Sequence, residues 1–441
     1  MAGSRGATLL LRCAAPKPFK VSYFSTSSRL GAQNYELVVV GSGAGGSAIA
    51  SKFGSKLGKG KVAVIEPSDV HYNQAMFTLI GGGLKKMENS ARPMSSVIPD
   101  TCDWFKDKAM EFDPKNDIVT TAAGDQIKYQ FLVVAMGLQL HYEYIKGLPE
   151  AFDVDPYLVT NYSPKYVSRT INGIETFKGG NAVFTLPNTP IKCAGAPQKI
   201  MYLAESKWKA SGIKNKTKLI YNTALGVMFS APKYAKVLEQ ICKERGIEVN
   251  FKRNLVEVRP DKKEADFMKL DTGETYTLPY DFMHVTPPMT PPTELMNSPI
   301  VDPTGYVNVN KNTLQHVVYP NIFAIGDCTN VPTSKTAAAA ASQCGVLRRN
   351  ITAAMNGKEL VPKYDGYTSC PLVTSYETCV MAEFGFDGHP METFPFNQAK
   401  ERRTMLLTKK HVLPVCYNLM LKGWWEGPAP FRKLFHLGLT K

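Results

Sequence analysis

The sequence lacks any apolar run long enough to cross a membrane. No stretch approaches the roughly 18 apolar residues that a spanning helix requires. Glycine and proline are not in excess either, at 34 and 30 of 441 residues. A chain of this length can hold two or three domains with a sizeable buried core. We therefore expect a globular protein that is not integral to a membrane.

Acidic residues are absent before Glu36. The same stretch contains many serines and the basic residues Arg5, Arg12, Lys17, Lys20 and Arg29. A segment that is rich in arginine and serine and free of acids is typical of a mitochondrial import signal, so residues 1–33 are predicted to be a transit peptide. A disordered basic tail is the alternative.

The charge balance is strongly basic. Removing those five cations from the formal net charge of +14 leaves about +9 on the remaining chain. Such a charge suits an acidic membrane surface or nucleic acid. No zinc-finger spacing or nucleic-acid motif is present, so no nucleic-acid partner is expected. A merely basic matrix protein remains the alternative reading of the charge.

The nine cysteines form no C-x-x-C pair, and no Cys/His cluster has the spacing of zinc ligands. We therefore predict no metal site. A protein imported into mitochondria is not expected to carry a framework of structural disulfides. Most of these cysteines should be buried thiols that pack as small apolar residues.

A glycine-rich motif follows the first apolar run. Residues 35–40 are strand-forming, and Gly41-Ser42-Gly43-Ala44-Gly45-Gly46 reads G-x-G-x-x-G before a helix-prone stretch. The first glycine permits a tight turn, the second lets a pyrophosphate approach, and the third lets helix and strand pack closely. A second strand, residues 62–65, ends at Glu66, where a ribose hydroxyl needs a carboxylate. This context predicts a dinucleotide site.

Further along, strands alternate with helices, which indicates parallel sheets covered by helices. The second unit is expected to contain strands at 181–186, 218–221 and 247–251 and helices at 196–210 and 231–245. Proline-rich residues 287–292 are predicted to connect this unit back to the first. Residues 313–327 are then expected to form a strand that ends in Gly326-Asp327. A helix capped by Thr336 should follow.

These motifs together resemble the two-dinucleotide-domain flavoproteins of the glutathione-reductase type. The resemblance implies an α/β fold with two Rossmann-like domains, FAD as cofactor, an Asp327 that meets the flavin chain, and a helix N-terminus at the flavin's pyrimidine end. The expected domains are 34–165 and 296–360 for FAD, 166–295 for the second Rossmann-like domain, and 361–441 for a C-terminal redox-cysteine and membrane-associating region. The expected FAD-binding residues are Gly41, Ser42, Gly43, Gly45, Gly46, Glu66, Gln74, Ala109, Gly326, Asp327, Lys335, Thr336, Ala337 and Ala338.

The second unit lacks the fingerprint that binds a nicotinamide in most of these flavoproteins. After Leu186 the chain reads Pro-Asn-Thr-Pro-Ile-Lys-Cys-Ala-Gly-Ala-Pro, with no glycine triad. Asn222 follows the next strand where a carboxylate would hold the ribose. The second cofactor site is therefore predicted to be lost.

Residues 187–199 and 367–373 resemble the mitochondrial type of sulfide:quinone oxidoreductase. The resemblance implies that Cys193 and Cys370 form a redox-active disulfide, which sulfide attacks to leave a persulfide on Cys370 and a thiolate on Cys193. Lys192 and Lys199 flank Cys193, and nearby cations lower a thiol pKa. Bacterial relatives often use a third cysteine. The setting of Cys102 does not match their motif, so we interpret Cys102 as structural. Cys379 should pack in a strand, and Cys328 is near the flavin by position.

The C-terminal region mixes aromatic, aliphatic and basic residues. Residues 413–425 and 431–437 have the composition of an interfacial segment, with Lys422, Arg432 and Lys433 expected on lipid headgroups. The resemblance implies peripheral docking on the mitochondrial inner membrane over a slot for ubiquinone. It also implies transfer of the sulfane sulfur to a small acceptor such as glutathione or sulfite. We expect a chain cut after about Arg403 to keep FAD.

Three alternatives remain open. The C-terminal segment could be an ordinary core helix. The chain could be a type II NADH:quinone oxidoreductase, which the missing second fingerprint disfavours, or a non-catalytic FAD-binding scaffold, which the two cysteines disfavour.

Overall fold

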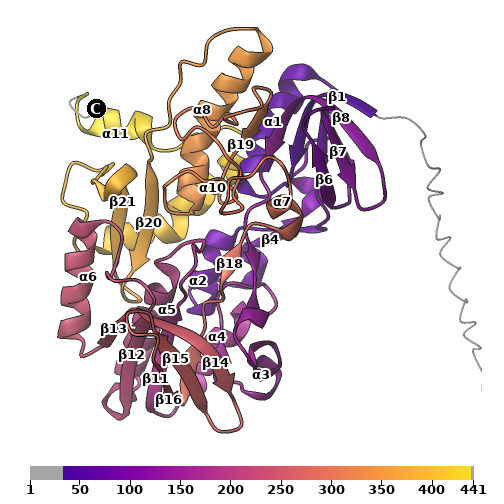
Figure 1. The fold of residues 1–441 in the computed structure, drawn as a ribbon. Coiled ribbons are helices and arrows are strands. Elements are labelled where there is room, and N and C mark those ends of the chain that lie inside the picture. Colours follow the sequence, from indigo (N-terminus) through magenta and orange to yellow (C-terminus); the bar gives the residue numbers. More distant parts are fainter. Residues whose placement is uncertain (1–32, 439–441) are drawn as a thin grey trace, which may run out of the picture. The chain divides into compact units, whose positions relative to one another are not determined.

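The computed structural model describes residues 33–438, which contain two large sheets (Figure 1). The first sheet has the order β5-β2-β1-β8-β7-β6, with β19 beside β8. The predicted transit peptide lies outside the described residues except for Gln33, which begins β1. The bounds are β1 (Gln33–Val40), β2 (Val62–Ile65), β5 (Cys102–Phe105), β6 (Ala109–Asp113), β7 (Ile118–Thr121), β8 (Gln126–Val134) and β19 (Ile322–Ala324).

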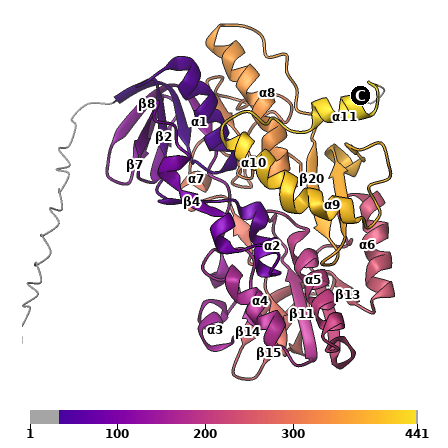
Figure 2. The ribbon, with the colours of Figure 1, turned by 180° about the vertical axis from the view of Figure 1, so that it is seen from behind.

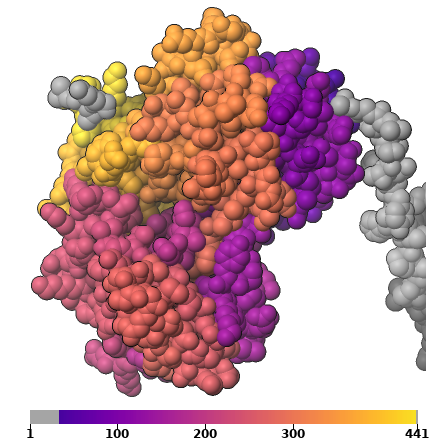
Figure 3. Space-filling model, in the orientation of Figure 1, coloured from indigo at the N-terminus to yellow at the C-terminus, as the bar shows by residue number. Residues whose placement is uncertain are grey.

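The centre of the first sheet is parallel and buried on both faces. Val40 of β1 lies between Ile65 of β2 and Val134 of β8 in register. Helices on the faces cover such a sheet, which explains its continuous apolar strands. Helix α1 (Ala44–Leu57) follows β1 and contacts α8 (Ala337–Met355). Figure 3 shows the late part of the chain, in orange, against the early strands, in indigo and purple.

The second sheet is also parallel, with the order β10-β17-β11-β12-β13. The predicted alternation of strands and helices is confirmed, and α5 has the expected bounds. The elements are β10 (Leu158–Val159), α4 (Val167–Thr176), β11 (Gly180–Leu186), α5 (Ala196–Ala210), β12 (Thr217–Thr223), α6 (Pro232–Glu244), β13 (Glu248–Phe251) and β17 (Phe282–His284).

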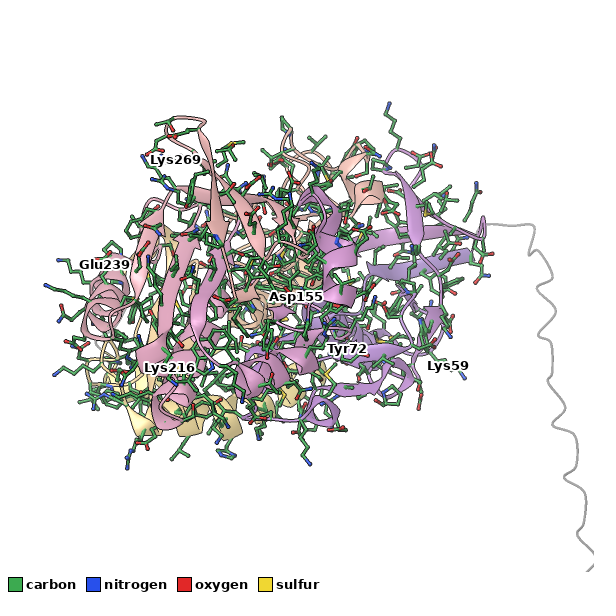
Figure 4. The ribbon with its side chains drawn as sticks, turned by 90° about the horizontal axis from the view of Figure 1, so that it is seen from below. Lys59, Tyr72, Asp155, Lys216, Glu239 and Lys269 are labelled. Carbon is green, nitrogen blue, oxygen red and sulfur yellow. The ribbon has the colours of Figure 1, made fainter. Side chains whose placement is uncertain are left out.

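Smaller elements join the sheets. The proline-rich connector contains β18 (Met289–Thr290), which pairs antiparallel with β9 (Gln139–Leu140). An antiparallel sheet of β14 (Arg253–Arg259), β15 (Glu264–Lys269) and β16 (Thr275–Pro279) lies beside the second sheet. Asp155, labelled in Figure 4, is buried and accepts hydrogen bonds from Tyr280 Oη at 3.0 Å and Lys263 Nζ at 2.6 Å. The predicted domain boundaries stay predictions.

The long strand expected over residues 313–327 is wrong in extent. Only β19 is a strand there, because Leu314 has a left-handed φ of 63° and Pro320 has no N–H to donate. Gly326-Asp327 still follows the strand after one residue, Ile325, so the acidic residue lies near the strand's carboxyl end as expected.

The C-terminal part begins with a hairpin and ends with short helices. Figure 2 shows α9 and α10 from behind, and α10 packs against α1. No helix within residues 33–438 combines the length and apolar character needed to cross a bilayer. The elements are β20 (Thr368–Val373), β21 (Cys379–Phe384), α9 (Arg403–Leu407), the π-helix η7 (Thr408–Val412), α10 (Leu413–Leu421) and α11 (Ala429–Phe435).

Candidate functional site

A cradle for a dinucleotide lies where β1 meets α1. Gly41 has a φ of +93°, and a Cβ there would lie 2.5 Å from Ala135 O. A Cβ on Gly46 would lie 1.9 Å from Gly41 O, so helix and strand approach closely only because both residues are glycine. Glu66 accepts hydrogen bonds from the N–H groups of Ser42 and Ser68, each at 2.8 Å. The carboxylate therefore also braces the glycine loop.

The late motif closes the other side of the same cavity. Burial raises the pKa of Asp327, and the charges of Lys335 and Lys192 oppose that effect. Thr336 caps α8, because its Oγ1 accepts a hydrogen bond from the Ala339 N–H at 3.0 Å. The positive end of the α8 dipole faces the cavity, where it would stabilise negative charge.

Both motifs line one cavity of about 1380 Å³. Ligand pockets usually measure about 300–1,000 Å³, so this cavity can hold a dinucleotide and a second molecule together. The cradle fits FAD in its glycines, its carboxylate and its helix N-terminus. Of the expected FAD-binding residues, all line the cavity except Gly46, which acts in packing.

The two predicted redox cysteines meet beside this cavity. Cys193 Sγ lies 3.8 Å from Cys370 Sγ, and Cys193 lines the cavity. Cys193 has a left-handed φ of 54°, and its N–H donates to Lys335 O at 2.7 Å. A Cβ on Gly195 would lie 2.6 Å from Cys370 Sγ, so the glycine of the Cys-Ala-Gly turn makes the close approach of Cys370 possible.

Lys199 supplies the charge at the pair. Its Nζ lies 2.9 Å from Cys193 Sγ and 3.8 Å from Cys370 Sγ. The hydrogen bond from the Cys370 thiol and the Lys199 ammonium hold the pKa of Cys193 well below its usual range. Donation to Cys193, together with burial, raises the pKa of Cys370. The pair therefore holds a thiolate at Cys193 and a thiol at Cys370.

The other flanking lysine has a different position. Lys192 Nζ donates to Gln74 Oε1 at 2.6 Å and lines the cavity, and burial lowers its pKa to about 8. Among the cysteines within residues 33–438, the others do not join the pair. Burial raises the pKa values of Cys102 and Cys328 to about 11 and that of Cys379 to about 12, as expected for packed thiols.

Sequence reasoning missed a third lysine at the site. Lys409 lies in the π-helix and is buried, and its Nζ donates to Ala75 O at 3.0 Å. Burial and the nearby Lys199 charge lower the pKa of Lys409 to about 8. π-Helical turns occur often at functional sites. Lys409 is followed by Lys410 and His411, so the local sequence carried no signal that this lysine in particular turns inward.

The C-terminal segment is part of the cavity wall. Tyr417 of α10 hydrogen-bonds through its Oη to His71 Nε2 at 2.9 Å, and His71 Nδ1 contacts Ser42 O at 3.2 Å. The helix is thus linked to the glycine loop. The expectation that a chain cut after Arg403 keeps FAD conflicts with these contacts, because the cut removes one side of the site.

The aromatic residues of this segment divide into two groups. Trp425, Phe431 and Phe435 line the cavity, and Phe431 and Phe435 are also 46% and 39% exposed, whereas Trp424 is 69% exposed and does not line it. Arg432 is buried and not at the surface, which corrects the expectation that it contacts headgroups; its guanidinium stacks on an aromatic ring. Exposed apolar residues from four elements remain available to a partner, namely Leu407 of α9, Val412 of η7, Val415 of α10 and Leu434 of α11.

Comparisons with known proteins agree with these features. A family model described as pyridine nucleotide-disulphide oxidoreductase matches residues 35–165 and 205–344. The chain is 51% identical to a Mus musculus protein named sulfide:quinone oxidoreductase, mitochondrial, over 92% of this chain and 91% of that protein. A Dictyostelium discoideum protein of the same name is 44% identical over 89% of this chain and 87% of that protein.

A solved structure shares the fold. The sulfide:quinone oxidoreductase of the bacterium Aquifex aeolicus superposes with a TM-score of 0.76 at 18% identity, covering 92% of this chain and 96% of that one. The expected class, an α/β fold with two Rossmann-like domains, is confirmed.

Proposed function

The chain belongs to the mitochondrial sulfide:quinone oxidoreductases, FAD-dependent enzymes of the pyridine nucleotide-disulphide oxidoreductase family, and we propose that it oxidises sulfide through the Cys193–Cys370 pair. Electrons pass to ubiquinone, and the sulfane sulfur passes to a small acceptor. The observation that carries this proposal is the cysteine pair itself, 3.8 Å apart, next to Lys199 and at the wall of the dinucleotide cavity.

The proposed first step is thiol–disulfide exchange. HS⁻ attacks Cys370 Sγ in a Cys193–Cys370 disulfide, the S–S bond breaks, and the electron pair of that bond remains on Cys193 as a thiolate. Cys370 then carries the persulfide. The Lys199 ammonium, 2.9 Å from Cys193 Sγ, stabilises the leaving thiolate.

The second step returns the pair to its starting state. A nucleophilic acceptor, such as glutathione or sulfite, takes the terminal sulfur from Cys370 and leaves a thiolate. That thiolate closes the disulfide with Cys193 as two electrons leave the sulfurs. FAD held by the glycine loop, Glu66 and Asp327 would supply the two-electron acceptor for this step and the route to quinone. Lys192, Lys335 and the N-terminus of α8 would hold the resulting negative charge.

We place the enzyme peripherally on the mitochondrial inner membrane. The outward apolar residues Trp424 and Leu434 adjoin the cavity-lining Trp425 and Phe435 in the chain, and Leu407 and Val415 are exposed on the preceding helices, which gives quinone a route from the lipid to the cavity. Lys422 Nζ lies 5.6 Å from the Trp424 ring, which suits the boundary between acyl chains and headgroups. Sulfide, ubiquinone, the sulfur acceptor and the membrane surface are the proposed partners.

Substitution of each cysteine tests the mechanism. Cys193→Ser and Cys370→Ser should bind FAD as the wild type does, because neither sulfur belongs to the cradle. Both should lose sulfide-driven flavin reduction under anaerobic conditions. Cys379→Ser, a buried cysteine in the neighbouring strand, is the matched control and should retain it. Sulfide reduction at a near wild-type rate in either of the first two variants would refute the disulfide mechanism.

A further inference from the structure

A buried polar unit joins three elements at the aromatic end of the cavity. Tyr367 just before β20, Glu383 of β21 and Arg432 of α11 are only 2%, 5% and 6% exposed. The Tyr367 hydroxyl donates to the Glu383 carboxylate. The Arg432 guanidinium lies 5.1 Å from the centroid of the Tyr367 ring, and its Nη2 lies 3.3 Å from Asp365. The ring and the hydroxyl of Tyr367 thus connect the buried Glu383 carboxylate with the buried Arg432 guanidinium.

Glu383 fixes the loop that follows the hairpin. Its carboxylate accepts hydrogen bonds from the Thr393 N–H at 2.7 Å, Thr393 Oγ1 at 2.8 Å and Gln398 Nε2 at 2.7 Å. Phe394 is the next residue, and its ring stacks on Phe435 of α11 with centroids 5.7 Å apart and an interplanar angle of 16°. The same loop therefore presents an aromatic ring to the cavity and to α11.

Arg432 fixes the helix on the opposite side. Besides its stack on Tyr367 it donates to Met391 O at 3.5 Å, at the start of the same loop. Phe431 and Phe435 flank Arg432 on α11, and both line the cavity with Phe394. One buried unit thus sets the positions of three cavity-lining rings.

Strand β20 separates this end of the cavity from the sulfur chemistry. Tyr367, Ser369 and Pro371 line the cavity, while Cys370 between them faces Cys193. The alternation follows from the two-residue period of a strand. The Ser369 hydroxyl donates to Met381 Sδ over 4.0 Å. A thioether sulfur is a weak acceptor, so a carbonyl oxygen of a bound ligand would take its place.

Burying a charge is costly unless the charge is paired, and loss of one partner leaves the other uncompensated. We propose that Glu383, Tyr367 and Arg432 form a positioning unit for the quinone: they hold Phe394, Phe431 and Phe435 as the walls that receive its planar head group. The inference deepens the proposed function and rests on it. The expected occupant is a quinone ring, because the walls are aromatic, the Ser369 hydroxyl supplies a donor between them and the cysteine pair, and Phe431 and Phe435 are themselves partly exposed beside the outward-facing Leu434.

The test separates the two half-reactions. Arg432→Gln removes the cation and the ring stack, and Arg403→Gln, an exposed arginine of α9 paired with Glu377, is the matched control. The KM for a short-chain ubiquinone analogue should rise roughly tenfold in Arg432→Gln. The rate of anaerobic flavin reduction by sulfide should stay within about twofold of the wild type. Arg432→Lys keeps the charge but not the planar stack, so it should recover part of the quinone affinity.

Contrary outcomes are distinct. An unchanged quinone KM in Arg432→Gln overturns the inference. An equal loss of rate in both half-reactions together with release of FAD also overturns it, because that result would mark a general structural role. Should Arg432→Gln not fold, Tyr367→Phe keeps the ring and removes one donor to Glu383; a quinone KM equal to that of the wild type would then overturn it.

Failure of the underlying function gives another signature. If sulfide does not reduce the wild-type flavin, the proposed reaction falls. The positioning role can still be decided by a binding measurement. Quenching of tryptophan fluorescence monitors how the same quinone analogue binds to oxidised wild-type and Arg432→Gln protein. Weaker binding in the variant supports it, and equal binding refutes it.

Discussion

Removing the Lys199 ammonium should raise the pKa of Cys193. Lys199→Met keeps much of the side-chain volume and deletes the charge 2.9 Å from Cys193 Sγ. Burial alone would lower the pKa of Lys199, but the two sulfurs raise it, so the residue is charged in the wild type. The variant therefore tests a real ion pair.

The size of the effect follows from the distance. At an effective dielectric constant of about 20, unit charges 2.9 Å apart attract by roughly 6 kcal/mol, which equals about four pKa units and is an upper limit. A hydrogen bond to a charged group contributes about 1.5–3 kcal/mol net, or about one to two units. We expect the Cys193 pKa to rise by about two units.

Alkylation measures this pKa directly. The protein is reduced, freed of reductant and treated with iodoacetamide across a pH series, and Cys193 labelling is followed by mass spectrometry. A thiolate reacts and a thiol does not, so the midpoint of the pH–rate profile should move up by about two pH units in Lys199→Met, and at a pH below both midpoints the rate should fall roughly 100-fold. Lys207→Met, on the same helix and exposed beside Glu175, should match the wild type. An unchanged pH profile in Lys199→Met would refute the assignment of Lys199.

Three further predictions concern the cofactor and the membrane. Asp327→Ala should weaken FAD retention roughly tenfold or more, since a charge-assisted hydrogen bond contributes about 1.5–3 kcal/mol; full occupancy after dialysis would contradict the placement of the Gly-Asp motif. Tyr417→Phe removes the hydroxyl that contacts His71 Nε2 at 2.9 Å. The variant should show a smaller FAD-dependent rise in melting temperature than the wild type. An unchanged rise would leave α10 outside the cofactor site. Replacing the exposed Leu407 and Trp424 by serine should reduce liposome binding while FAD absorbance stays constant. Unchanged liposome binding in this variant would place the membrane contact elsewhere. High salt should weaken binding of the wild type only partly, because apolar contacts resist screening.

Local patterns predicted much of the fold and of the cradle. The glycine spacing after β1, Glu66 after β2 and the alternation of strands and helices are properties of short segments, so they are readable without the tertiary structure. The extent of the strand before Gly326 was not, because Leu314 adopts a left-handed backbone conformation that its residue type does not suggest.

Other parts of the site depend on contacts between distant segments. Lys199 was one of two lysines near Cys193 in the sequence. Only the tertiary structure shows that Lys199, on α5, contacts Cys193, whereas Lys192, before that helix, contacts Gln74. Arg432 belongs to a segment whose composition suits a membrane surface, and Lys409 lies just before that segment, yet both side chains turn inward. Composition predicted the exposed apolar residues of this segment but could not assign individual cations to the surface or to the cavity.

The most direct test of the account is the anaerobic absorption spectrum of the purified protein as sulfide and then ubiquinone analogue are added. With a sulfur acceptor present, sulfide should bleach the oxidised FAD band and quinone should restore it, while NADH has no effect because the second domain lacks a nicotinamide fingerprint. A spectrum that sulfide leaves unchanged, or that NADH bleaches in the absence of sulfide, would contradict the account.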